Sequence, residues 1–307
     1  MSGVSDRLAG PLRALAVGSL EGQVTPASAT SPVSVANGLV QVEILFRSEA
    51  DVAMINLASY GGQTEIRMDR RVQAQLPPAS LNAVAQLPQV VQVRVPNRVW
   101  PLQGFGASSS EGVQMTLATA MHANGVLGEG ARIAVIDTGF TGYATAEIPG
   151  VADGERTREF GGATLGDGAH GTAVAEVVAD MAPAAEIWLL AVDTELAFEQ
   201  AIEFVRDNGF DIAVASLGIF GGPYDGTHPV SQKLAASPRV LWVIAAGNHA
   251  KRHYEGNWTD RNHDSFHEWA MGDADLNVEL APGRFVAYLS WFQSAGQITN
   301  RDYDLVL

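Results

Sequence analysis

The run Ala131 to Phe140 (ARIAVIDTGF) constrains the fold of this chain more than any other segment. Its core, Ile133 to Ile136, is apolar without the alternation of a half-exposed strand, so it predicts a strand buried on both faces. Such strands belong to parallel sheets that helices cover on both sides, and Thr138-Gly139 then turns the chain. Functional side chains gather at the carboxyl ends of these strands, where Asp137 stands.

A histidine begins the next apolar helix. The run His170 to Val178 (HGTAVAEVV) predicts a helix at whose start Gly171 allows a close backbone approach. A carboxylate that orients an imidazole belongs to a Ser-His-Asp triad, so we expect an Asp137 oxygen about 2.6–3.2 Å from a ring nitrogen of His170. Taken singly, the Asp is also a common turn former and the His a common structural cap. The expected buried stripe of the helix consists of Ala173, Val174, Val177 and Val178.

These two motifs resemble those of the subtilases, the subtilisin-like serine proteases, and two later segments extend the resemblance. Ile212 to Gly218 (IAVASLG) is similar to the strand of that family that lines the substrate, and Val240 to Asn248 (VLWVIAAGN) is similar to its oxyanion strand. The resemblance implies that Asn248 offers its amide to the developing oxyanion. It also implies that Ser216, Leu217 and Gly218 pair with the peptide and that Ala245, Ala246 and Gly247 form the other wall of the specificity pocket.

The resemblance implies a serine endopeptidase that acts on peptide and protein substrates through an Asp-His-Ser triad, yet the nucleophile is missing. No Gly-Thr-Ser motif occurs from Lys251 to Leu307, and no Gly-x-Ser-x-Gly elbow occurs anywhere. The last residues, Asp302 to Leu307, read as the middle of a strand, so we expect a truncated reading frame that is inactive as written. The alternatives are a catalytically inactive peptide-binding pseudoprotease and an inhibitory or chaperone propeptide module with a remnant protease domain.

The expected fold class is α/β, a subtilisin-like parallel sheet with helices on both faces. Residues 39–96 have the order β-α-β-β-α-β of a ferredoxin-like unit and resemble the family's propeptide, which occupies the active-site cleft before removal. An independent small binding domain is the alternative for this unit. The expected regions are 1–38 (helix and linker), 39–96 (propeptide-like), 97–110 (exposed linker and site of maturation cleavage), 111–250 (incomplete catalytic domain) and 251–307 (partial β-rich insert).

The pattern of apolar residues places individual elements within these regions. Expected helices span Ser5 to Val17, Ala50 to Tyr60, Pro77 to Leu87, Glu111 to Asn124 and Leu196 to Asn208. Expected strands of the propeptide-like region span Leu39 to Phe46, Thr64 to Met68, Val72 to Leu76 and Val90 to Val95. In the insert, whose first part is Trp258 to Trp269, they span Val278 to Leu280, Arg284 to Trp291 and Tyr303 to Leu307.

No cofactor is required by this chemistry, but the insert raises a metal hypothesis. Asp260, Asn262 and Asp264 have the alternate oxygen spacing of a calcium loop, whereas Ser265 replaces the glycine and Met271 the bidentate glutamate of an EF-hand. Any calcium site would therefore be irregular, and a polar surface loop is the alternative. Two histidine pairs at i, i+4 would suit zinc only on a helix, namely His249 with His253 and His263 with His267.

Composition restricts the class of partner. Acidic residues outnumber basic ones by 34 to 19, and the net charge of −15 argues against nucleic acid and anionic membranes. No apolar run reaches the roughly 20 residues of a membrane span. Because the chain has no cysteine, its sequence does not indicate an oxidising or a reducing compartment. The family resemblance implies secretion, whereas the apolar run Leu8 to Leu12 is too short for a signal peptide. These two indications of the protein's cellular location disagree.

Overall fold

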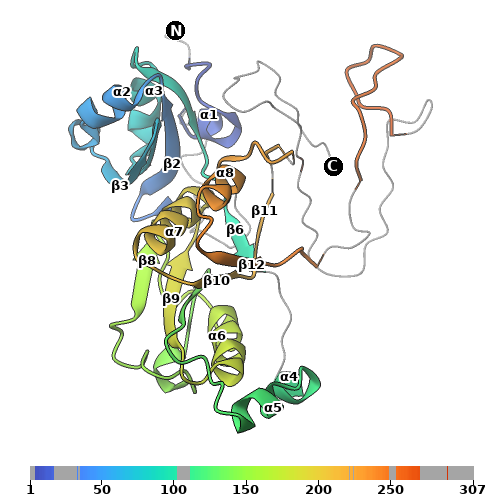
Figure 1. The fold of residues 1–307 in the computed structure, drawn as a ribbon. Coiled ribbons are helices and arrows are strands. Elements are labelled where there is room, and N and C mark those ends of the chain that lie inside the picture. Colours follow the sequence, from blue (N-terminus) through green and yellow to red (C-terminus); the bar gives the residue numbers. More distant parts are fainter. Residues whose placement is uncertain are drawn as a thin grey trace.

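A computed structural model describes residues 4–16, 33, 35–101, 111–220, 222–223, 225–248, 254–269 and 289 (Figure 1). An antiparallel sheet with short helices comes first in the chain, and a parallel sheet with longer helices follows. The strands predicted at 278–280, 284–291 and 303–307 fall outside the described residues, except for Leu289.

The N-terminal unit is an antiparallel sheet in which β4 lies along one edge of β2 and β5 along the other. β3 continues the sheet beyond β4, and the short β1 pairs with the start of β2. From β2 to β5 the strands and α-helices follow the expected β-α-β-β-α-β order. The strands are β1 (Val35–Ala36), β2 (Leu39–Phe46), β3 (Gln63–Met68), β4 (Arg71–Leu76) and β5 (Val90–Arg94). The helices are α1 (Gly10–Ala16), α2 (Glu49–Met54) and α3 (Leu81–Ala85), with 3-10 turns η1 (Leu57–Tyr60) and η2 (Pro78–Ser80).

Two of these helices differ from expectation, and local capping explains one of the differences. The helix predicted from Ala50 to Tyr60 is two pieces, because Asn56 accepts a hydrogen bond from the Ala58 amide and so starts η1 as a separate turn. α2 itself begins with a capping box between Ser48 and Asp51. α1 is also shorter than predicted, since it starts at Gly10 rather than Ser5.

The second unit contains a five-stranded parallel sheet in the order β12-β10-β7-β9-β8. These strands are β7 (Arg132–Asp137), β8 (Thr157–Phe160), β9 (Glu186–Val192), β10 (Ile212–Ala215) and β12 (Leu241–Ile244). β7 is the middle strand and is buried from Ile133 to Asp137, as its uninterrupted apolar run predicts. Alternate residues of β7 enter two separate cores: Ala134 and Ile136 join one, Ile133 and Val135 the other.

Helices cover both faces of this sheet, so the predicted α/β architecture is present. α7 (Glu195–Asp207) packs on one face, and α8 (Pro229–Ala235) lies beside it. α6 (His170–Met181) packs on the other face through Ala175 and Ala179. The buried positions of α6 are Gly171, Thr172, Ala175 and Ala179. Of the predicted stripe, Val174 and Val178 are half-buried and pack against this core, whereas Ala173 and Val177 are exposed, so the prediction was wrong for these two. Small residues face the sheet because they allow the helix to approach it closely.

The helix predicted from Glu111 to Asn124 is broken in the middle. α4 (Glu111–Met115) and α5 (Ala118–Ala123) are separated by Leu117, whose φ of 61° is left-handed. A left-handed residue ends a helix, so the two short helices point in different directions (Figure 1). The predicted end at Gly125 is correct, since this glycine has a φ of 78°.

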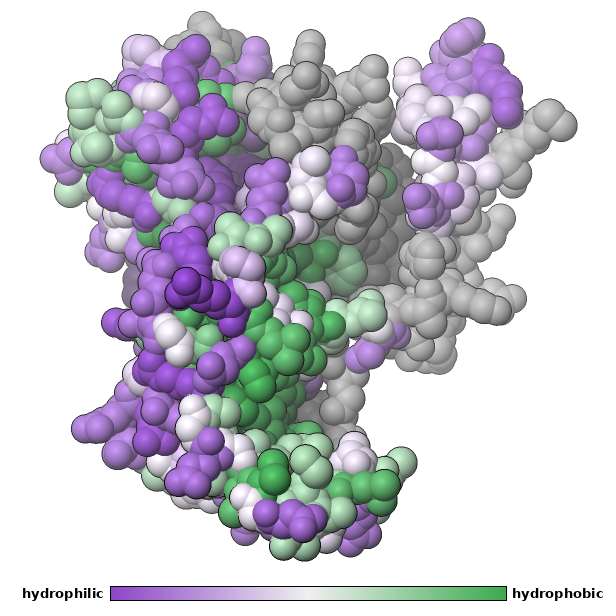
Figure 2. Space-filling model, viewed as in Figure 1, coloured by the Kyte–Doolittle hydropathy of each residue, from purple (hydrophilic) through white to green (hydrophobic). Residues whose placement is uncertain are grey.

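Apolar side chains remain exposed on β12, α6 and the α4–α5 pair, and Figure 2 shows a green surface along this side of the molecule. β12 pairs with β10 along one edge, and no described strand pairs with its other edge. Leu241, Val243 and Ile244 of β12 are exposed, as are Val177 and Met181 of α6. Among the described residues, β12 thus forms an exposed sheet edge made of residues that are typical of a protein core.

Candidate active site

Asp137 and His170 form a close pair at the carboxyl edge of the parallel sheet. His170 Nδ1 lies 2.7 Å from Asp137 Oδ2, which confirms the predicted contact. The Asp137 side chain is fully buried, and its other oxygen accepts a hydrogen bond of 2.8 Å from the Thr138 amide. Burial raises the pKa of Asp137 above its ordinary value, while His170 and the Thr138 amide oppose that shift. The buried carboxylate therefore fixes an imidazole that keeps access to solvent.

Gly171 allows this pair to form. Gly171 donates its amide to the Gly139 carbonyl at 3.1 Å, which joins the start of α6 to the turn after β7. A Cβ on Gly171 would lie 2.6 Å from the Gly139 carbonyl oxygen and 2.7 Å from the Asp137 Cβ. The absence of a side chain at Gly171 brings the preceding residue, His170, onto the carboxylate.

A separate two-stranded sheet lies near this edge. The predicted strand Ile212 to Gly218 is divided, because β10 ends at Ala215 and β11 (Leu217–Ile219) begins after Ser216 in another sheet. β11 pairs antiparallel with β6 (Val99–Pro101), in the register Leu217 with Pro101, Gly218 with Trp100 and Ile219 with Val99. Leu217 and Gly218 were predicted to pair with a peptide, and the chain's own residues 99–101 lie on β11.

This pairing corrects the prediction of an exposed linker from residue 97. Val99 is only 4% exposed and belongs to the core shared with α7 and β11. A local sequence reading missed the pairing because the two strands are more than a hundred residues apart and β6 is only three residues long. Residues 102–110 lie outside the described residues.

The segment Ala245 to Asn248 follows β12 at the same edge of the sheet. The Ala245 amide donates to the Ala215 carbonyl at 3.1 Å. The segment therefore starts beside the end of β10, next to Ser216. Gly247 has a φ of 98°, a backbone conformation that favours glycine. All four residues are exposed. The sheet therefore brings the predicted substrate and oxyanion segments to the end where Asp137 lies.

The N-terminal unit contacts α7 through buried charges. Arg71 of β4 makes two hydrogen bonds to Glu199, at 2.9 and 2.7 Å, and the Glu199 side chain is fully buried. Burial raises the pKa of Glu199, and the hydrogen bonds from Arg71 oppose that shift. Lys233 of α8 lies 3.9 Å from the same carboxylate. The Arg71–Glu199 pair thus holds the antiparallel sheet on α7, and Lys233 of α8 lies 3.8 Å from Asp69 of the N-terminal unit.

The oxygens proposed for calcium serve the loop that contains them. Asp260 accepts hydrogen bonds from the amides of Asp264 and Ser265, while Asn262 Oδ1 accepts from the Asp264 amide. In the described residues no group of three or more His, Cys, Asp or Glu side chains is arranged to hold a metal. His263 has a left-handed φ of 62° in a loop without a helix, so the helical zinc pair with His267 is ruled out. His249 and His253 lie outside the described residues.

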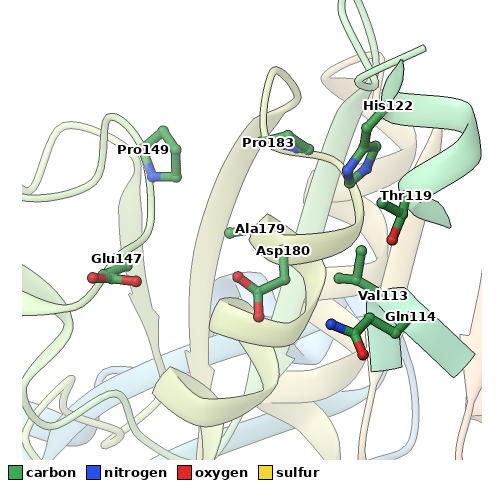
Figure 3. Close-up of a pocket in the computed structure, with 9 residues that line it drawn as sticks. All are labelled: Val113, Gln114, Thr119, His122, Glu147, Pro149, Ala179, Asp180 and Pro183. Atoms are coloured by element: carbon green, nitrogen blue, oxygen red, sulfur yellow. The ribbon is translucent and has the colours of Figure 1, made fainter. Parts of the chain in front are cut away.

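A pocket of ≈ 330 Å³ lies away from the Asp137–His170 pair (Figure 3). Ala179 and Asp180 line it from near the end of α6, whereas His170 is the first residue of that helix. His122 of α5 and Glu147 lie on other sides of the pocket. None of the predicted site residues contributes to its lining.

Sequence reasoning missed Asp193, which follows β9 at the same carboxyl edge. Its carboxylate lies 3.2 Å from the Arg98 guanidinium, beside the segment that pairs with β11. The signal was present in the sequence, because Asp193 ends a buried apolar strand just as Asp137 does.

Comparisons with known proteins give a partial similarity. No protein-family model matches the chain. Subtilisin Savinase of Lederbergia lenta is 30% identical over 155 residues, which cover 45% of this chain and 55% of that protein. Subtilisin BL of the same organism is 31% identical over 155 residues, with the same coverage. The crystal structure of an epidermin leader peptide processing serine protease from Staphylococcus aureus has a TM-score of 0.49 at 14% identity, and the match covers 72% of this chain and 66% of that one.

The similarity supports a relation to subtilisin-like serine proteases at low identity. The chain spans about half the length of the relatives that it matches. No helix among the described residues has the length and apolar character that a membrane span requires.

Proposed function

We propose that this chain carries part of the catalytic machinery of a subtilisin-like serine endopeptidase. The observation that carries the proposal is the 2.7 Å contact between His170 Nδ1 and the buried Asp137 carboxylate at the carboxyl edge of a parallel sheet. The similarity to subtilisins supports it. In this mechanism Asp137 orients the imidazole, and His170 takes the proton of a serine hydroxyl and later donates it to the leaving amine.

Other residues have roles in the same mechanism. The Asn248 side-chain amide would stabilise the oxyanion, and its position after β12 at the same sheet edge supports that role. Ser216, Leu217 and Gly218 would pair with the substrate backbone, with Ala245, Ala246 and Gly247 on the other side of the peptide. A nucleophilic serine in a Gly-Thr-Ser motif is required and does not occur in these 307 residues.

The N-terminal unit has the role of a propeptide in this proposal. Its last residues run as β6 along β11, where a substrate would pair, and Arg71 anchors the unit on α7. A strand that occupies the substrate position excludes other peptides from it. The unit therefore keeps the cleft closed until the connection after residue 101 is cut and the unit dissociates.

The test uses the full-length product of the gene. Full-length protein should hydrolyse a chromogenic peptide, and His170→Ala should reduce kcat by on the order of 10⁶, the loss known from subtilisin itself. Asp137→Asn should reduce kcat by about 10⁴. Asn248→Ala should reduce it by roughly 10²–10³, again the scale known from subtilisin. Undiminished hydrolysis by His170→Ala protein would contradict the assignment.

One observation favours a second candidate, a peptide-binding protein without catalysis. The sequence contains β11, which would pair with a peptide, but no Gly-Thr-Ser motif. Such a protein would bind extended peptides along β11 and leave them intact. If the full-length product binds peptides and hydrolyses none, this second candidate replaces the first.

A further inference from the structure

The segment Asn97 to Pro101 is bound as an extended strand from two sides. On one side β6 pairs with β11. On the other side the Glu195 amide donates to the Asn97 carbonyl at 2.8 Å, and the Val99 amide donates to the Asp193 carbonyl at 3.3 Å. These main-chain contacts are those with which a groove holds a peptide of any sequence.

Two side chains of the bound segment add contacts that do depend on sequence. Arg98 places Nη1 3.2 Å from Asp193 Oδ2, and its Nη2 donates to Gln41 Oε1 at 2.7 Å. Val99 is buried in an apolar cluster that includes Leu196 and Leu217. The groove thus holds residue 98 at an acidic position and residue 99 at an apolar position.

The surroundings of Asp193 favour the binding of a cation. Its side chain is 15% exposed, and Arg98 provides the only guanidinium or ammonium group within ion-pair distance among the described residues. Burial raises its pKa, while Arg98 and a hydrogen bond from Gln41 oppose that shift, and nearby Glu65 adds to it. The Gly162 amide also donates to Asp193, at 3.3 Å. A carboxylate removed from water in this way gains strongly from a matching guanidinium.

The contacts divide between the two units. Asp193, Gly162 and β11 belong to the unit with the parallel sheet, whereas Gln41 and Glu65 belong to the N-terminal unit. A peptide that bound after the N-terminal unit had left would therefore meet Asp193 and the apolar position without Gln41, whereas in the full chain Gln41 stays beside Asp193.

We propose that this groove selects extended peptides in which an arginine immediately precedes a β-branched aliphatic residue, and that Asp193 is the residue that selects the arginine. The inference rests on the proposed function, in which β11 pairs with the substrate. Arg98-Val99 is the chain's own example of the recognised sequence.

The experiment measures binding of a fluorescent peptide with the sequence of residues 97–101, NRVWP, by anisotropy. The full chain carries Arg98→Glu and Val99→Asp to displace its own strand from the groove. We expect NRVWP to bind at least tenfold more tightly than the same peptide with glutamate or alanine in place of arginine, since the ion pair with a buried carboxylate is lost. Adding Asp193→Asn should reduce this preference to less than about threefold, whereas Asp207→Asn, an equal change of charge on the α7 surface, should keep it.

A second measurement uses chains that retain the native strand. Hydrogen exchange of the Leu217 to Ile219 amides should become at least tenfold faster in Arg98→Asp and in Asp193→Arg. The double variant Arg98→Asp with Asp193→Arg should restore protection, because the pair is rebuilt with reversed charges. Equal binding of arginine, alanine and glutamate peptides, or unchanged protection in both single variants, would overturn the inference and leave Asp193 as an internal anchor only.

The two proposals fail separately. A full-length protein that hydrolyses no peptide but prefers NRVWP tenfold would refute the protease and keep the recognition site. A protein whose hydrolysis depends on His170 but not on an arginine in the peptide would keep the protease proposal and refute the recognition site.

Discussion

Asp137 illustrates how a single buried residue links stability to function. Its carboxylate is fully buried and its pKa is raised mainly by burial, so the folded protein binds a proton at Asp137 more readily than the unfolded chain does. The stabilisation from proton uptake is complete below the unfolded-state pKa and is lost as pH rises through the raised folded-state pKa. Keeping this carboxylate charged near neutral pH therefore costs stability.

The variant Asp137→Asn is neutral at every pH and tests this cost. At about pH 7 it should have a larger free energy of unfolding than the unchanged chain, and the difference should shrink as pH falls toward about 4. Urea unfolding at several pH values measures the trend. The control Asp207→Asn removes an exposed carboxylate whose pKa is lowered by Arg206, so any trend should have the opposite sign. A pH-independent loss of stability in Asp137→Asn would contradict the argument.

Gly171 provides a second prediction at this scale. A methyl group there would meet the Gly139 carbonyl oxygen and the Phe140 ring, each at 2.6 Å. Gly171→Ala should lower the free energy of unfolding by about 1–3 kcal/mol, because packed backbone must move. Gly112→Ala, in exposed helix α4 with nothing within 4 Å, should be neutral or slightly stabilising. Equal effects of the two substitutions would show that Gly171 is not under steric constraint.

At the scale of elements, sequence predicted what depends on continuous local patterns. β7 and α7 lie within a residue or two of their expected bounds, because a buried strand and an amphipathic helix each carry their own periodicity. The break at Leu117 and the pairing of β6 with β11 were missed, since a left-handed Leu has no sequence signal and β6 pairs with a distant segment. The Asp137–His170 contact was predictable because strand end and helix start each fixed one side chain.

The contact between β4 and α7 allows a test of how the two units are joined. Arg71→Leu would leave Glu199 buried without its two hydrogen bonds, with Lys233 at 3.9 Å as the one remaining cation among the described residues. The loss should be about 3–5 kcal/mol in the free energy of unfolding, measured with urea. Replacing both residues, Arg71→Leu with Glu199→Leu, should recover most of it. Arg206→Leu, at an exposed ion pair, should leave stability unchanged, and an Arg71→Leu effect no larger than that would refute the argument.

At the scale of the whole molecule, the two edges of the parallel sheet differ in composition. β8 carries the exposed charges Arg158 and Glu159, which discourage pairing with another chain. β12 consists of Leu241 to Ile244 without charge or proline, and most of it is exposed. An uncharged apolar edge favours association between molecules.

Val243→Lys should therefore reduce concentration-dependent association of the 307-residue chain, as measured by light scattering after gel filtration. The added ammonium would be poorly solvated if a second strand covered the edge. Met54→Lys places the same charge on an exposed apolar residue of α2 and should change association little. If both lysines reduce association equally, net charge rather than the β12 edge is responsible.

The covalent link between β5 and β6 determines how dilution changes the occupancy of the groove by residues 99–101. Only four residues, 95–98, separate Arg94 from Val99, so the strand on β11 is held near its site by a short tether. Short tethers give effective concentrations in the millimolar range, which a free peptide rarely reaches. Cleavage after residue 101 leaves that tether on the N-terminal unit, and the strand then leaves the groove only when the whole unit dissociates. Release becomes a bimolecular equilibrium, and diluting the cut protein opens the groove while diluting the uncut chain does not.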